Sequence, residues 1–143
     1  MITQAEALEK LTPAVRAFLD EPRYAVVASI QEDGLPHLTV VWYRLQHDTV
    51  LMNEGRKRTR ARHLRRDPRL AFCVEDGTRY VTITGACELQ SVDQEHALAD
   101  IVSLAIRYHG EEQGRAMQSF FAQEQRETIL LHIESVHTRG FDD

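Results

Sequence analysis

The sequence predicts a mainly β domain with flanking helices, in which six short antiparallel strands form a closed or half-closed barrel. Runs of β-favouring residues follow one another at short intervals along the chain. The breaks between them are tight polar turns, as at residues 31–34 and 76–77. Gly85 interrupts the longest run and indicates a bulge or a sharp bend of the kind that barrels contain.

The chain begins with helix signals and then changes to strand signals. Thr3 and Glu6 form a capping-box pair, and Thr12 followed by Pro13 starts a second helical stretch that stops at Pro22. The predicted strands are residues 24–30, 38–45, 49–52, 70–74, 79–91 and 127–133. Because the turns between the first three are short, we expect these strands to pair antiparallel as hairpins.

Three further helices are predicted among the strands. A short exposed helix follows Gly55 and ends at Asp67-Pro68, and a longer one begins at the capping residue Asp93 and closes at Gly110. Another helical stretch covers residues 115–123. With 143 residues, 43% of them hydrophobic, the chain has material for the core of one domain, which we expect to span residues 1–143.

Composition excludes several classes of function. The net charge of −5 argues against a nucleic-acid binder. The apolar runs are short and the start of the chain lacks signal-peptide features, so we expect no membrane span. Cys73 and Cys87 read as small buried residues kept reduced in the cytoplasm, and the seven histidines form no metal-binding motif.

A concentrated basic segment stands out against the acidic remainder. Between Arg56 and Arg69 lie eight Lys or Arg residues and one acid, Asp67. A turn that leads into a helix N-terminus offers free amide donors and a positive dipole end, which bind phosphate. Arginines and a threonine hydroxyl there add further hydrogen bonds. The alternative is an ordinary solvated helix face, which is the interpretation we prefer for three of its arginines: Arg65, Arg66 and Arg69.

Four stretches resemble the pyridoxamine 5'-phosphate oxidase superfamily of flavin-binding split barrels, and most closely its class that uses the deazaflavin coenzyme F420. They are residues 32–43, 52–69, 80–89 and 133–141. The second is the most specific, because it joins a strand, a basic turn and a helix that ends in Arg-Arg-Asp-Pro-Arg. The resemblance implies a six-stranded split β-barrel of the FMN-binding type and a homodimer with two cofactor sites at the subunit interface.

The resemblance also implies cofactor-binding residues. Arg60 takes the place of the family's phosphate-binding lysine or arginine, and Arg58 and Thr59 line the same pocket. The residues expected near the ring are Thr39, Val40 and Val41 on one strand, Met52 and Asn53 on an adjacent strand, and Tyr80 from the partner subunit. For Trp42 and Tyr43 a plain place in the barrel core is at least as good an interpretation.

The function implied is an oxidoreductase that transfers hydride to or from a small organic substrate. F420 is preferred over FMN because of the resemblance and because surplus arginines suit its acidic oligoglutamate tail. No catalytic side chain is identified, which fits chemistry that the cofactor carries. Alternatives are an FMN-dependent oxidoreductase, a noncatalytic flavin or haem carrier, and a nucleic-acid binder, which the acidic remainder disfavours. Near the C-terminus we find no residues typical of pyridoxamine phosphate oxidation.

Overall fold

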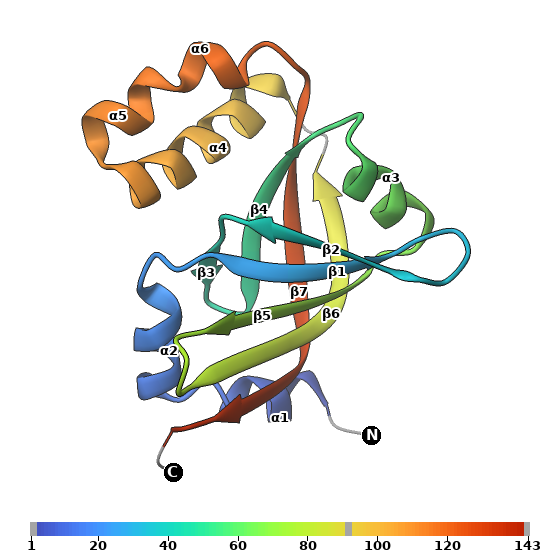
Figure 1. Ribbon diagram of the computed structural model, residues 1–143, viewed down its shortest axis with the longest axis vertical. Helices are drawn as coiled ribbons and strands as arrows, with labels where there is room; N and C mark the ends of the chain where they lie inside the picture. The colour runs from blue at the N-terminus through green and yellow to red at the C-terminus, as the bar shows by residue number, and fades with distance from the viewer. Residues whose placement is uncertain (1–2, 91–92, 142–143) are drawn as a thin grey trace.

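The computed structural model describes residues 3–90 and 93–141 and contains one antiparallel sheet with helices beside it (Figure 1). The strands are β1 (Ala25–Ile30), β2 (Pro36–Val41), β3 (Arg44–Gln46), β4 (Thr49–Gly55), β5 (Arg69–Glu75), β6 (Tyr80–Gln90) and β7 (Arg126–Arg139). The helices are α1 (Gln4–Glu9), α2 (Pro13–Asp20), α3 (Thr59–Arg66), α4 (Gln94–His109), α5 (Glu111–Ala116) and α6 (Gln118–Phe121). The strand order is β2-β1-β5-β6-β7-β4-β3.

The mainly β class is confirmed, whereas the expected number of six strands and a closed barrel are wrong. The sheet has seven strands, and among the described residues no ladder joins its edge strands β2 and β3, so it is open. The expected strand 38–45 divides because β2 pairs with β1 whereas β3 pairs with β4. Between them Tyr43 is fully buried, and its hydroxyl donates to the carbonyl oxygen of Leu19 at 2.8 Å. This anchor holds the chain at the crossing from one edge to the other.

The end of the last strand also differs from the expectation. The last strand continues to Arg139 rather than ending at residue 133, because its second half pairs with β6 from Tyr80 onward. The expected end of β6 at Ser91 lies outside the described residues.

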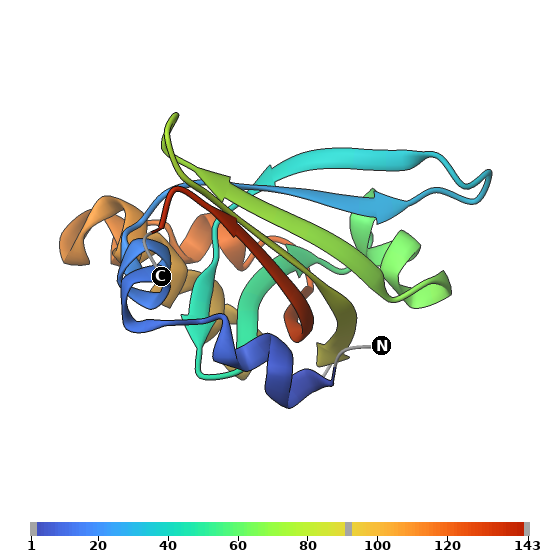
Figure 2. The same ribbon diagram turned by 90° about the horizontal axis from the view of Figure 1, so that it is seen from below.

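The sheet is strongly curled, so that strands from both of its halves enclose one core (Figure 2). Alternate residues of β1, β4, β5, β6 and β7 point into this core, as the alternating burial of β5 shows. α1 and α2 close it with Ala7, Leu11, Val15, Phe18 and Leu19. The core thus positions β2 and β4, which are far apart in the strand order, near the same end of the molecule.

A second apolar cluster packs α4 and α6 on the opposite side of β4. It contains Leu51, Ile101, Leu104, Ala105 and Phe121. Arg107 of α4 fixes this layer to the rest of the domain. Its guanidinium donates to the backbone carbonyls of Leu19, Asp20, Glu21 and Tyr43 at 2.7 to 3.1 Å. None of the described helices is long and apolar enough to cross a membrane.

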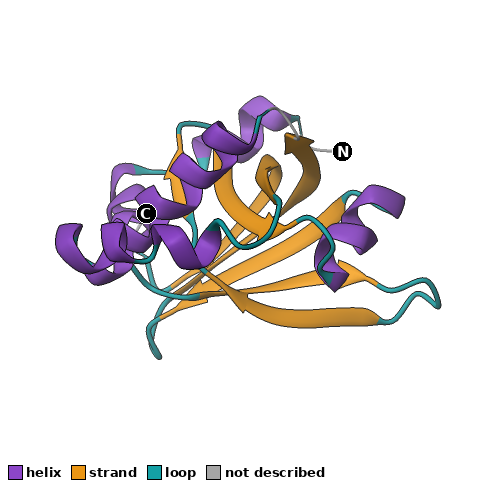
Figure 3. Ribbon diagram, turned by 90° about the horizontal axis from the view of Figure 1, so that it is seen from above, coloured by secondary structure: helices purple, strands orange, loops and turns teal. Residues whose placement is uncertain are grey.

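One face of the sheet is left uncovered by the helices (Figure 3). Val26, Leu38 and Val40 point outward there, and they are 44%, 66% and 65% exposed. Val26 and Val40 are direct cross-strand partners, so the apolar side chains are contiguous. We call these three residues the bare face; they form an exposed apolar patch of the kind that marks interaction surfaces.

The bulge expected at Gly85 is confirmed. The β6–β7 register shifts between Thr84 and Gly85, and a Cβ on Gly85 would overlap the carbonyl oxygen of His132. Only glycine leaves room for this close approach of two backbones.

We expect Gly85→Ala to lower the free energy of unfolding by about 2 kcal/mol, because β7 must shift to admit the methyl group. Urea denaturation measures this. Glu134→Ala, at an exposed position beside the bulge, is the control and should change stability by less than about 0.5 kcal/mol. Equal stabilities of the two variants would contradict the close approach.

Candidate functional site

The basic turn between β4 and α3 presents an open helix N-terminus. Arg58 is the N-cap residue of α3, in extended conformation, and its side chain makes no capping hydrogen bond. The helix is held in place, because His63 Nδ1 lies 2.9 Å from Ser29 Oγ of β1 and Arg65 binds both carboxylate oxygens of the buried Glu127. The first amides of α3 are therefore fixed and uncapped by a side chain, which suits an anion.

Arg60 is the buried centre of this region. The residue is only 7% exposed, although its guanidinium carries a full charge. One terminal nitrogen donates to Thr39 Oγ1 of β2 at 2.5 Å, and Nε lies 2.8 Å from Glu54 Oε2 of β4. Arg60 thereby connects α3 with two strands that are separated by four others in the sheet order.

The contact between Arg60 and Glu54 is ionic rather than a well-formed hydrogen bond. Neither Arg60 Nε nor Glu54 Oε2 has a hydrogen-bond partner of acceptable geometry among the described residues, although both atoms are buried. Burial raises the pKa of the Glu54 carboxyl above its ordinary 4.5, against the opposing effect of Arg60 and then Arg126. Burial likewise lowers the pKa of Arg60, against the effect of Glu54. The two charged groups are in contact, but Arg60 Nε and Glu54 Oε2 lack well-formed hydrogen bonds.

A second acidic residue lies at the rim of the same site. Glu124 Oε1 is 3.1 Å from Arg58 and 3.4 Å from Arg126. Its carboxylate lies directly against Gly55, where a Cβ would collide with it. Arg58 is largely exposed, so this outer ion pair is solvated, in contrast to the inner pair of Arg60 and Glu54.

A cavity of about 190 Å³ opens beside Arg60. Its walls come from β2 and the residue after it, β4, α3, α4 and α6, and they are mostly apolar: Val40, Val41, Trp42, Asn53, Arg60, Ile101, Leu104 and Phe121. The amide of Asn53 is already fixed, since its nitrogen donates to the carbonyl of Ala97 at 2.8 Å and its oxygen accepts from Arg126 at 2.7 Å. An apolar wall beside a cation suits a flat ring with an anionic chain.

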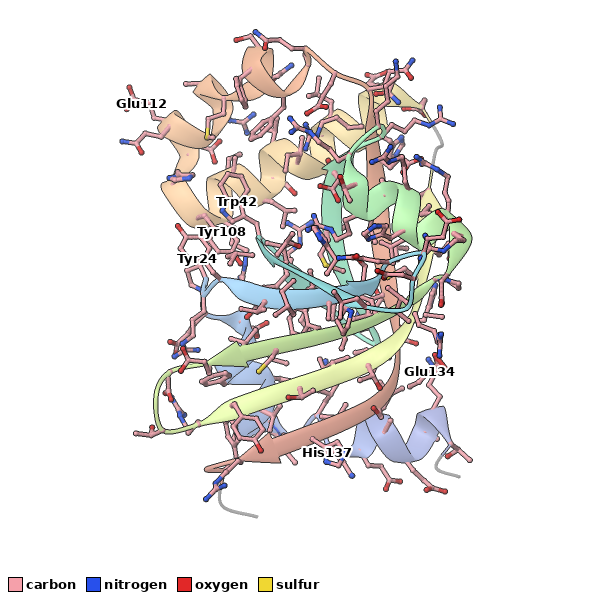
Figure 4. All side chains as sticks on the ribbon, turned by 45° about the vertical axis from the view of Figure 1, so that its right-hand side comes forward. Tyr24, Trp42, Tyr108, Glu112, Glu134 and His137 are labelled. Carbon is pink, nitrogen blue, oxygen red and sulfur yellow. The ribbon has the colours of Figure 1, made fainter. Side chains whose placement is uncertain are left out.

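Trp42 is held in the cavity wall by a stack of aromatic rings. Its ring lies 5.5 Å from that of Tyr108 at an interplanar angle of 14°, and Tyr108 stacks on Tyr24 at 5.6 Å and 6° (Figure 4). Tyr108 also donates its hydroxyl proton to the carbonyl of Arg23 at 2.7 Å. Since the stack joins α4 to the start of β1, the wall is rigid.

The structure brings most of the expected binding residues together. Arg60, Val40, Val41 and Asn53 line the cavity, and Thr39 holds Arg60. Arg58 and Thr59 are exposed at the entrance to α3. Two expected residues lie elsewhere: Met52 is buried in the main core, and Tyr80 lies at the start of β6 beside a different hollow. Their roles at the ring stay predictions.

The sequence analysis missed several residues that complete the site: Glu54, Glu124, Arg126, Ile101, Leu104 and Phe121. Glu54 had one available signal, because it is an acid directly before Gly55 and the basic run. The others come from α4, α6 and the start of β7, more than 30 residues along the chain, and no local pattern marks them.

A comparison of the sequence with protein families finds one match, to the family described as pyridoxamine 5'-phosphate oxidase, over residues 11–139. The match covers nearly the whole chain, and the chain belongs to this family. The resemblance to the pyridoxamine 5'-phosphate oxidase superfamily, inferred from four stretches of the chain, is thereby confirmed, and its F420-dependent class stays a prediction. No curated protein matches the sequence.

Solved structures agree on the fold. A conserved hypothetical protein from Mycobacterium tuberculosis is 27% identical, with a TM-score of 0.74 over 97% of this chain and 85% of that one. A structure described as an F420 reductase is 21% identical, with a TM-score of 0.71 over 85% and 94% of the two chains. The haem storage protein HutZ from Vibrio cholerae is 17% identical, with a TM-score of 0.70 over 92% and 96%. The fold therefore serves proteins of different function.

Replacing Arg60 with Met removes the partner of a buried carboxylate. We expect the free energy of unfolding to fall by about 2 to 4 kcal/mol near neutral pH, because Glu54 is left charged and uncompensated. The pKa of Glu54 is raised in the folded state and rises further without Arg60. The loss of stability in Arg60→Met is therefore complete above the raised pKa of Glu54. It shrinks as the pH falls through that pKa towards the ordinary value of 4.5.

Urea denaturation at several values between about pH 8 and about pH 5 measures this dependence. The exposed Arg69 lies at the end of the same basic segment, and Arg69→Met is the control that should show little loss at any pH. A deficit for Arg60→Met that stays constant over this range would show that Glu54 is not its cause.

Proposed function

We propose that this chain is an oxidoreductase that binds coenzyme F420 by its phosphate at Arg60 and the N-terminus of α3, and transfers hydride to or from a small organic substrate. The observation that carries the proposal is Arg60 itself. It is a buried guanidinium at the edge of an apolar cavity, and its Nε lacks a well-formed hydrogen bond. Such a group favours an added oxygen acceptor.

The residues present fit a phosphate group followed by a flat ring. Arg60, the amides of α3, and Arg58 and Thr59 at the entrance supply donors for the phosphate. Thr39, Val40 and Val41 offer the edge of β2 to the ring, with Asn53 opposite. When bound, F420 or a flavin supplies the ring position that gives or accepts the hydride. The chain's own part is to hold the phosphate, orient the ring and exclude water.

A homodimer belongs to this proposal. The cavity is smaller than the 300 to 1,000 Å³, roughly, of a typical cofactor site, so a second copy that covers its open side would complete it. The bare face adjoins the cavity through Val40 and is apolar enough to bind a second copy. Tyr80 lies on the same side of the sheet, two residues before Thr82, which is in line with Cys73 and Val26 across the ladder; this favours its contact with the partner.

We expect purified protein to bind F420, and Arg60→Gln to weaken that binding by about tenfold or more, because a charge-assisted contact to the phosphate is lost. Fluorescence titration measures both. Arg69→Gln is the matched control and should bind as the wild type does. Titration with FMN runs in parallel, and binding of FMN with no affinity for F420 would replace F420 by FMN in the proposal.

Turnover separates the enzyme from a noncatalytic flavin or haem carrier, the alternative that the likeness to HutZ supports. The reduced cofactor is bound to the protein and mixed with electrophilic organic substrates, and its reoxidation is followed by absorbance. Stoichiometric reoxidation faster than that of the free cofactor is the expected result for an enzyme. A bound cofactor that no substrate reoxidises, or tight binding of haem alone, would favour the carrier.

We expect Leu38→Glu to dissociate the dimer, because two charges would be buried at a symmetric interface of apolar side chains. Analytical ultracentrifugation measures the change in mass. Gln113→Glu, an exposed position on α5, adds the same charge away from the bare face and should leave the dimer intact. A wild-type protein that sediments as a monomer at all concentrations would contradict the interface.

A further inference from the structure

The anion site contains its own carboxylates. Glu54 lies 2.8 Å from Arg60 in the buried part of the site, and Glu124 lies 3.1 Å from Arg58 and 3.4 Å from Arg126 at the rim. A site evolved only for the strongest possible attraction to phosphate would not hold negative charges in contact with its arginines. The acids therefore set how much negative charge the site accepts.

Four charged groups lie around Glu54 in the ion pairs of this site. Arg58 precedes α3, Arg60 lies within α3, Arg126 begins β7 and Glu124 precedes β7. Together with Glu54 these groups comprise three positive and two negative charges. Within this set of five groups the surplus is one positive charge, which a ligand group with one negative charge balances and a second negative charge exceeds.

Glu54 cannot easily withdraw from the site. Glu54 is part of the β4–β7 ladder, where it is paired with Glu127, and its side chain is only 15% exposed. If a bound phosphate became the sole partner of Arg60, the buried Glu54 carboxylate would be left without a counter-charge, which is energetically costly. The bound phosphate must then share Arg60 with Glu54, and each added negative charge on the phosphate meets this carboxylate at close range.

Phosphoryl groups differ in this charge. A phosphomonoester such as that of FMN carries about 1.5 to 2 negative charges at pH 7, because its second pKa is about 6. A phosphodiester, such as the one that links the ribityl chain of F420 to its tail, carries one. We propose that Glu54 makes this site selective for a phosphodiester monoanion over a phosphomonoester dianion. The inference rests on the proposed function and names the residue and the charge by which the site would distinguish F420 from FMN.

The test compares two ligands that share one ring. FMN and the methyl ester of its phosphate, a diester, are titrated into the wild type at about pH 8, where FMN is a dianion. We expect the diester to bind about tenfold more tightly than FMN. Glu54→Gln should abolish this preference, mainly by tightening FMN. Glu124→Gln is the matched control; because Glu124 is more exposed and screened by solvent, it should change the preference less.

If Glu54→Gln does not fold, the pH dependence of binding to the wild type still tests the inference. As the pH falls below about 6, FMN becomes a monoanion and the two affinities should converge. Equal affinities at pH 8, or a preference that Glu54→Gln leaves unchanged, would overturn the role of Glu54 while leaving cofactor binding intact. Failure of the wild type to bind FMN, its ester and F420 would overturn the proposed function, and this inference with it.

Discussion

The contact between Arg60 and Glu54 is the constraint on which the arrangement of this site depends. The guanidinium of an arginine that is only 7% exposed is stable only where groups such as a carboxylate and a hydroxyl lie close to it, and here they come from β4 and β2. These two strands are separated by four others in the sheet order, so the contact is possible only because the sheet curls. The buried ion pair therefore depends on the curvature of the sheet.

The rest of the molecule supports this contact from two sides. The main core fills the concave side of the curled sheet and fixes β4 through Val50 and Met52. α4 and α6 pack on the other side of β4, and the carbonyl contacts of Arg107 hold that layer to the N-terminal segment. The cavity lies where the two layers meet, which explains why its wall includes residues of both.

The bare face leaves the edge strand β2 of the open sheet exposed. A closed barrel has no edge strand to expose, whereas here β2 is an edge strand with apolar side chains directed to solvent. Monomeric proteins seldom leave such a strand uncovered, and the cavity lies beside it. The proposed pairing of two copies would cover the strand and complete the cofactor site with the same contact.

The sequence by itself determined what depends on neighbours along the chain. Gly85 marked the bulge, and the basic turn after Gly55 marked the start of α3 and, through its motif, the family. Only the tertiary structure decided that Arg60 faces Glu54, that Trp42 lines a cavity, and that residues 38–45 split between opposite edges of the sheet. Bulges, caps and turns are local conformations with local residue preferences, whereas these contacts join segments whose distance is set by the curl of the whole sheet.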